Sequence, residues 1–191
     1  MRDGLALPSA RWKQHRLVEE RTAAHIRPFT VQDRQKNAFL VSGTEVLFLP
    51  EAFPRLEGVT VYNGWFPALS RPATVLSALA GAAAHHPGGR RLIDTLTRPF
   101  IGPPGGPDTA ERARSRTYVV AAASGAPGGS PLAEVRLEGP SIYNLTGELM
   151  AFAADQLATG AGFTPGVVSP ADAFGLDTLR QGCARIGLTP V

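Results

Sequence analysis

The chain has 191 residues, of which 43% are hydrophobic, and its formal net charge of +3 comes from 19 basic and 16 acidic side chains. This hydrophobic content suffices for a sizeable core, no stretch reaches the roughly 20 apolar residues that span a bilayer, and a single cysteine excludes an internal disulfide framework. Because basic and acidic residues are interspersed, we expect no nucleic-acid partner. The lack of a long apolar run predicts no membrane partner, and the single cysteine together with an opening segment that has no apolar signal core predicts a cytoplasmic location.

The chain begins with a segment rich in charged residues. In residues 1–20, Trp12 is flanked by Arg11, Lys13 and other polar residues. We therefore expect an exposed lead-in before a domain over residues 21–191. Two short strands are then expected. The first holds Pro28, which cannot donate to a central ladder and therefore indicates an edge strand. The two predicted strands cover residues 24–31 and 38–41.

A short helix and an aromatic strand follow. Gly43 and Pro54 bound the helix predicted over residues 44–52, where Glu45 either faces a cleft or caps the helix. Residues 59–66 alternate in the manner of a strand and are rich in β-branched and aromatic side chains. Neither face of this strand is fully polar, so three of its residues are expected near the interior: Tyr62, Asn63 and Trp65.

The middle of the chain predicts a helix, a long loop and a hairpin. Pro72 begins a helix whose apolar stripe includes Val75 and Leu79, and the segment IGPPGGP over residues 101–107 indicates a loop. Arg112, Arg114 and Arg116 alternate like the polar face of a strand. Two extended runs separated by a Gly- and Pro-rich loop then predict a hairpin formed by residues 117–123 and 132–137.

Two helices are predicted at the carboxyl end. Asn144 is expected to cap the first, and Gly160 to end it. Its apolar residues fall on one side and are expected to be buried: Ile142, Leu145, Leu149, Phe152, Ala153 and Leu157. Glu148, Asp155 and Thr159 fall on the other side. Ser169, followed by Pro170 and Asp172, has the pattern of a capping box for the second helix. The expected buried side of that helix is Leu176, Leu179, Cys183 and Ile186.

Strands and helices interleave along the chain, and the hairpin implies antiparallel pairing. The sequence therefore predicts an α+β fold, as a single domain with a mixed, largely antiparallel sheet and helices packed mainly on one face.

Two segments resemble the carboxy-terminal, non-nucleotide domain of saccharopine dehydrogenase-like NAD(P) oxidoreductases. The first is the strand end and Tyr143 turn that lead into the long alanine-rich helix, followed by the Gly-Val-x-x-Pro link at Gly166 and the closing helix. The second is the Gly-Thr-Glu-x-x-x-Leu-Pro segment that begins at Gly43. The resemblance implies a substrate-binding and dimerising domain of an oxidoreductase that moves a hydride between a nicotinamide and a small substrate, often an amine or imine beside a carboxylate.

The amino-terminal Rossmann domain of that family has no counterpart in this chain, because no Gly-x-Gly-x-x-Gly follows a predicted strand. We therefore expect that the chain alone binds no cofactor and is inactive, with NAD(P) implied for the complete enzyme. The expected partners are a second copy in a homodimer, or a separately encoded Rossmann domain, together with a small-molecule substrate. The alternative is a self-sufficient, non-catalytic module for ligand binding or dimerisation.

Six residues are candidates for the substrate cleft, although no pair among them identifies an acid and a base. Tyr143 and Asn144 either cap and pack the start of the long helix, or line the cleft beneath a nicotinamide ring, where helix amides attract anions. The other four candidates likewise have either a structural role or a place in the substrate cleft: Glu45, Tyr62, Asn63 and Trp65.

Overall fold

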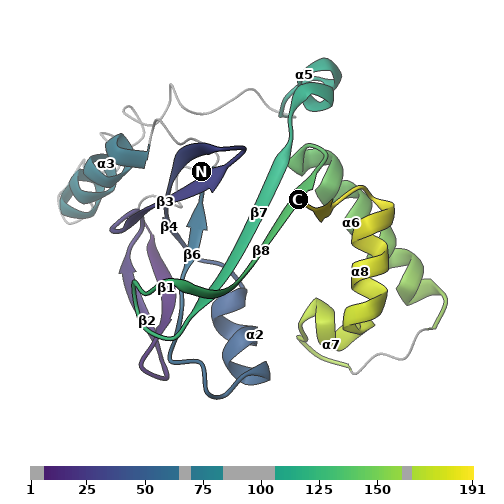
Figure 1. Cartoon of the computed structure of the whole chain (residues 1–191), viewed down its shortest axis with the longest axis horizontal. Helices are drawn as coiled ribbons and strands as arrows, with labels where there is room; N and C mark the ends of the chain where they lie inside the picture. The colour runs from purple at the N-terminus through teal and green to yellow at the C-terminus, as the bar shows by residue number, and fades with distance from the viewer. Residues whose placement is uncertain (1–6, 65–69, 84–105, 161–164) are drawn as a thin grey trace. The chain divides into compact units, whose positions relative to one another are not determined.

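The structure is a computed structural model that describes residues 7–64, 70–83, 106–160 and 165–191 (Figure 1). The chain divides into two compact units, Met1–Pro103 and Pro104–Val191. The division falls inside the IGPPGGP segment, where the sequence predicts a loop within one domain. Each unit has its own sheets and helices, and each is described by itself.

Two antiparallel sheets of three strands form the first unit. One has the order β2-β1-β5 and the other β3-β4-β6. The first sheet consists of β1 (Pro8–Lys13), β2 (Arg16–Arg21) and β5 (Gly58–Val59). The second consists of β3 (Ile26–Val31), β4 (Arg34–Val41) and β6 (Val61–Asn63). The strands predicted over residues 24–31 and 38–41 are thus confirmed as β3 and β4.

The exposed lead-in predicted for residues 1–20 is wrong, because most of it is the β1–β2 hairpin. Ser9 is 2% exposed and shares a hydrogen bond of 2.6 Å with Thr22, while the Trp12 indole donates to the Leu56 carbonyl over 3.0 Å. The hairpin turns at Gln14 and His15, whose φ angles of 50° and 58° are those of a type I′ turn. Asn-Gly usually marks such a turn, so the sequence carried no turn signal here.

Two helices pack on these sheets. α2 (Glu45–Ala52) contacts β1 and β5, and it confirms the helix predicted over residues 44–52. α3 (Ser70–Ala83) contacts β4 and β2. The apolar stripe predicted for α3 is not its buried side, since Val75 and Leu79 are 61% and 57% exposed. Arg21 of β2 instead donates to the Thr74 carbonyl over 2.8 Å and to the hydroxyl of Ser77, which turns the polar side of α3 toward the sheet.

The second unit contains one antiparallel sheet with the order β7-β8-β9. Its strands are β7 (Thr117–Ser124), β8 (Pro131–Gly139) and β9 (Thr189–Pro190), so the predicted hairpin is confirmed. α5 (Thr109–Arg114) precedes it and corrects the strand-like interpretation of Arg112 and Arg114. The Asp108 side chain accepts from the amide of Glu111 over 2.7 Å, and this cap favours the helix over an extended chain.

Three further helices complete this unit: α6 (Ile142–Ala158), α7 (Pro170–Phe174) and α8 (Leu176–Arg185). Ser141 caps α6, its hydroxyl accepting from the Asn144 amide over 3.3 Å, so the cap expected of Asn144 is wrong. Ser169 caps α7 as predicted. Gly175, at φ 78°, separates α7 from α8 where one helix was expected, and Leu176 is 65% exposed rather than buried.

The predicted α+β class is confirmed, although the described strands form three small antiparallel sheets rather than one mixed sheet. The core of the first unit is Ala23, Ala38, Phe39, Leu40 and Val46, and that of the second includes Leu145 and Leu188. None of the helices in the described ranges has both the length and the apolar character that crossing a bilayer requires.

Candidate functional site

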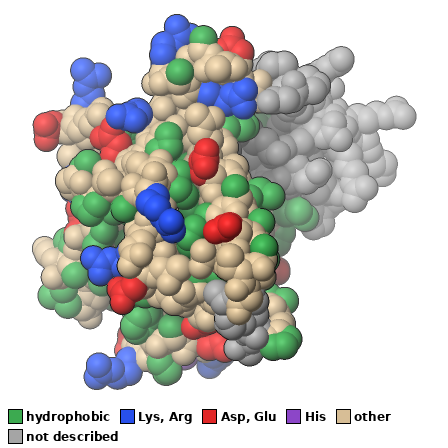
Figure 2. Space-filling view, turned by 90° about the vertical axis from the view of Figure 1, so that its right-hand side faces the viewer, with side chains coloured by type: hydrophobic (Ala, Val, Ile, Leu, Met, Phe, Trp, Pro, Cys, Tyr) green, Lys and Arg blue, Asp and Glu red, His purple; other side chains and the backbone are tan. Residues whose placement is uncertain are grey.

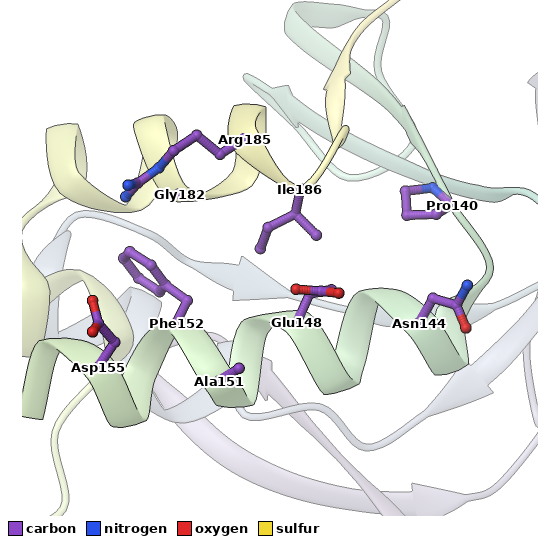
Figure 3. Close-up of a pocket in the computed structure, with 9 residues that line it drawn as sticks. All are labelled: Pro140, Asn144, Glu148, Ala151, Phe152, Asp155, Gly182, Arg185 and Ile186. Atoms are coloured by element: carbon purple, nitrogen blue, oxygen red, sulfur yellow. The ribbon is translucent and has the colours of Figure 1, made fainter.

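A pocket of about 550 Å³ lies between α6 and α8 in the second unit (Figure 3). The end of β8 closes one side of it through Pro140. Both helices contribute polar and apolar side chains. The residues that matter for its chemistry are Asn144, Glu148, Phe152, Asp155, Gly182 and Arg185.

Gly182 lets the two helices approach closely at one end of the pocket. It is buried in α8, and a Cβ placed there would lie 2.9 Å from the Phe152 ring. Phe152 also meets Phe174 of α7 edge to face, with ring centres 5.9 Å apart. The aromatic wall of the pocket is therefore held on two sides, and its ring has little freedom to turn away.

The pocket carries charges of both signs. Glu148 and Asp155 project from α6, and their separation of seven residues puts them about 10.5 Å apart along the helix. The Arg185 guanidinium lies 5.9 Å from the centre of the Phe152 ring, within reach of a cation–π contact. Among the described residues, Arg185 forms no ion pair with a carboxylate. Its planar fork is thus available to a ligand carboxylate, while Glu148 and Asp155 suit an ammonium group.

The two predicted candidates of this unit have different surroundings. Asn144 lines the pocket, near the end closed by Pro140 (Figure 3). Tyr143 is 50% exposed, and its ring lies against Gly106, where an added Cβ would be 2.7 Å from the ring. The geometry therefore gives Asn144 a place in the site and gives Tyr143 the packing role.

The remaining candidates belong to the first unit. Glu45 is exposed in the first turn of α2, where a carboxylate suits the helix dipole, and its side chain folds back beside Gly43 and Val61. Tyr62 packs edge to face on Phe29, with ring centres 5.7 Å apart. Asn63 follows Tyr62 on β6 and so points to the opposite face. Trp65 lies outside the described residues.

Several pocket residues were missed as functional residues. Glu148 and Asp155 had been placed on the side of the helix opposite to the buried one. A sequence signal did exist, because Phe152 sits four residues after Glu148 and three before Asp155, which puts an aromatic ring between two acids on neighbouring helical positions. Arg185 and Gly182 carried no comparable signal, since their roles depend on how α8 packs on α6.

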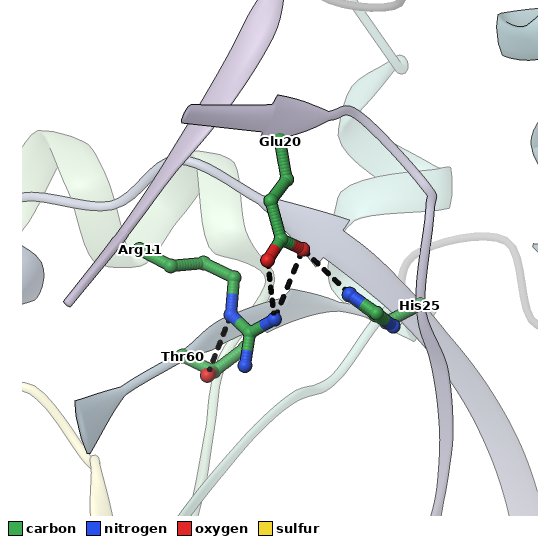
Figure 4. Close-up of polar contacts among 4 residues, drawn as sticks. All are labelled: Arg11, Glu20, His25 and Thr60. Atoms are coloured by element: carbon green, nitrogen blue, oxygen red, sulfur yellow. Dashed lines mark hydrogen bonds and ion pairs between the residues drawn. The ribbon is translucent and has the colours of Figure 1, made fainter. Parts of the chain in front are cut away.

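A second polar cluster in the first unit links β1 and β2 to the two segments that lead from their sheet to the other sheet (Figure 4). Arg11 donates to both carboxylate oxygens of Glu20 over 3.0 and 2.9 Å, and its Nε donates to Thr60 over 3.2 Å. The His25 ring nitrogen Nε2 lies 2.5 Å from the same carboxylate. Burial by itself raises the pKa of Glu20, but the hydrogen bonds and charges of Arg11 and His25 outweigh it and hold this pKa below its ordinary value.

This cluster predicts a loss of stability in acid. A carboxyl group whose pKa is lowered in the folded state stabilises the fold at pH values above its unfolded pKa of about 4.5. This contribution is lost as the pH falls through the pKa of the folded state. Glu20→Gln should therefore lower the free energy of unfolding by about 1 to 2 kcal/mol at pH 7, and by progressively less below pH about 4.5.

Denaturant unfolding at a series of pH values measures this difference. Glu19→Gln is the matched control, since Glu19 is an exposed neighbour on the same strand. A difference between Glu20→Gln and the unaltered chain that stays constant with pH would contradict the account of the cluster.

Charged side chains are scattered over the face seen in Figure 2. Basic and acidic residues alternate there with hydrophobic and uncharged ones. This face presents no broad region of one charge to a partner.

Comparison with known proteins identifies no relative. No family model, no curated protein and no solved structure matches the chain. The function is therefore argued from the pocket and from the residues that line it.

Proposed function

We propose that the α6–α8 pocket binds a small molecule that carries ammonium and carboxylate groups. We further propose that the chain is the substrate-binding part of an NAD(P)-dependent oxidoreductase similar to the saccharopine dehydrogenase-like enzymes. One observation supports both: the pocket residues, from Pro140 to Ile186, all fall within the carboxy-terminal segment that carries the resemblance. The segment expected to shape a substrate cleft thus builds the described pocket.

The charges of the pocket favour a particular kind of ligand. Two carboxylates and one guanidinium line it, from Glu148, Asp155 and Arg185. A dibasic amino acid such as L-lysine has the complementary set, with two ammonium groups and one carboxylate. The three charged side chains are exposed at the rim of the pocket. Charge-assisted hydrogen bonds contribute more than neutral ones, so this match selects against diamines and against simple acids.

The nicotinamide cofactor does not fit the described residues of this chain. Their sheets are antiparallel, so none of the described strands forms the parallel strand–turn–helix unit whose glycine turn holds a pyrophosphate. In the pocket, the space in front of Gly182 is filled by Phe152. NAD(P) would therefore have to be held by a Rossmann domain outside this sequence. A separately encoded domain of this kind and a second copy of the chain are the proposed partners.

A non-catalytic ligand-binding module is the alternative. It is favoured by the position of the pocket, whose lining residues come from one unit and need no nucleotide domain to complete them. An in-frame upstream segment or an adjacent reading frame that encodes a Gly-x-x-Gly-x-x-Gly loop after a strand would favour the oxidoreductase. Binding of the ligand to this chain alone is expected under both proposals, so it does not decide between them.

Isothermal titration of the full chain tests the proposed ligand class. L-Lysine should bind with a Kd between about 10 μM and 1 mM, which corresponds to roughly 4 to 7 kcal/mol. Cadaverine, which has the two amines but not the carboxylate, should bind at least about tenfold more weakly because Arg185 gains no partner. Equal affinities for the two compounds, or no saturable heat with L-lysine, would contradict the proposal.

A further inference from the structure

The charged groups of the α6–α8 pocket lie in two separate places (Figure 3). Glu148 and Asp155 project from α6, and the step of seven residues between them corresponds to about 10.5 Å of helix. The Arg185 side chain runs along α8 toward the Asp155 end, and its guanidinium lies 5.9 Å from the centre of the Phe152 ring. We call Asp155 and Arg185 the head end of the pocket, and Glu148 the tail end.

The part of the pocket between these ends is apolar. Phe152 comes four residues after Glu148 and three before Asp155, and Ile186 projects from α8 toward α6 (Figure 3). Both apolar side chains are half-buried. Neither can form a hydrogen bond, so this part favours the methylene groups of a ligand over its polar atoms. A ligand that spans the pocket should therefore have an aliphatic chain between charged ends.

The head end sets the direction of the ligand. In an α-amino acid the ammonium and carboxylate groups are attached to the same carbon, so they need an acidic and a basic side chain at the same end of the pocket. Asp155 and Arg185 provide this pair of charges. The reversed ligand would place its carboxylate beside Glu148, where like charges repel.

The spacing of the two carboxylates sets the length of the ligand. The six bonds between the nitrogens of L-lysine span about 7.6 Å when extended, whereas the four bonds in L-2,4-diaminobutyrate span about 5.1 Å. A hydrogen bond from ammonium to carboxylate adds about 2.8 Å at each end. Over about 10.5 Å of helix, L-lysine therefore reaches both carboxylates through slanted hydrogen bonds, but the shorter compound needs both bonds in line with its chain.

We propose that the pocket selects both the direction and the length of its ligand. The head end binds the α-ammonium and α-carboxylate, and Glu148 is the specificity-determining residue that binds the side-chain ammonium. This inference rests on the proposed function, because it takes a dibasic amino acid as the ligand. It narrows the ligand class to free amino acids whose amines are as far apart as those of L-lysine. A lysine inside a protein is excluded, since its α-nitrogen and carboxyl group form uncharged peptide bonds.

Isothermal titration of the full chain with L-lysine, L-norleucine and 6-aminohexanoate tests the direction. L-Norleucine lacks the side-chain amine of L-lysine, and 6-aminohexanoate lacks the α-amine. Glu148→Gln should weaken the binding of L-lysine and 6-aminohexanoate by about three- to fivefold and leave that of L-norleucine within about twofold. Asp155→Asn should weaken L-lysine and L-norleucine by the same factor and spare 6-aminohexanoate. Asp177→Asn is the control, since Asp177 is exposed on α8 outside the pocket, and it should change none of the three affinities.

L-2,4-Diaminobutyrate tests the length. It should bind about three- to fivefold more weakly than L-lysine, and Glu148→Gln should not weaken it further. An equal effect of Glu148→Gln on L-norleucine and L-lysine, or an affinity for L-2,4-diaminobutyrate equal to that for L-lysine, would overturn this inference and leave the proposed function standing. Absence of saturable binding of L-lysine to the unaltered chain would instead overturn the proposed function, and this inference with it.

Discussion

Leu145→Ala should lower the free energy of unfolding by about 2 to 5 kcal/mol, the range for large-to-small changes in a packed core. Leu145 is 4% exposed, which makes it the most buried hydrophobic residue of α6. Removing its side chain leaves a cavity under the helix that carries the pocket. Denaturant unfolding followed by circular dichroism gives the two free energies.

Leu132→Ala is the matched control for this change. Leu132 belongs to the same unit but is 81% exposed, so its truncation should cost less than about 1 kcal/mol. If both variants unfolded at the same denaturant concentration, the assignment of α6 to the core of the second unit would be wrong.

Arg185→Ala should weaken the binding of L-lysine by about 10- to 150-fold, equivalent to the roughly 1.5 to 3 kcal/mol of a hydrogen bond to a charged group. It should also abolish the preference for L-lysine over cadaverine, because the carboxylate then has no partner. Isothermal titration with both compounds measures the two effects together.

Arg180→Ala provides the control, since Arg180 is exposed on the same helix and does not line the pocket. It removes the same charge from α8 but should leave both affinities unchanged within about twofold. Equal losses in the two variants would show that Arg185 acts through the net charge of the helix rather than through contact with the ligand.

Much of the fold could be predicted from the sequence where local signals were strong. The hairpin β7–β8 follows from two extended runs around a Gly-rich loop, and Ser169 capped its helix as its spacing with Asp172 indicates. The β1–β2 hairpin was missed because its turn uses Gln14 and His15 in the left-handed region. Nothing local distinguishes such residues from an exposed lead-in.

The candidate site was harder to predict because it depends on the packing of two helices. Periodicity correctly favoured burial for Leu145, but it assigned Leu157 to the buried side, and this residue is 55% exposed. It could not show that Glu148 and Asp155 face α8, since a pattern within one helix does not identify what lies beside it. Among the described candidates, Asn144 alone lines the pocket.

Amide NMR spectra of the full chain with increasing L-lysine test the central claim most directly, because they locate the ligand as well as detect it. The account predicts shifts that saturate and that gather in the pocket, at Asn144, Glu148 and Gly182 and at the side chain of Arg185. The amides of β1 and β2 in the first unit should not move. Saturating shifts that gather in the first unit, or no shift at concentrations well above a Kd of about 1 mM, would contradict the claim that the α6–α8 pocket is the binding site.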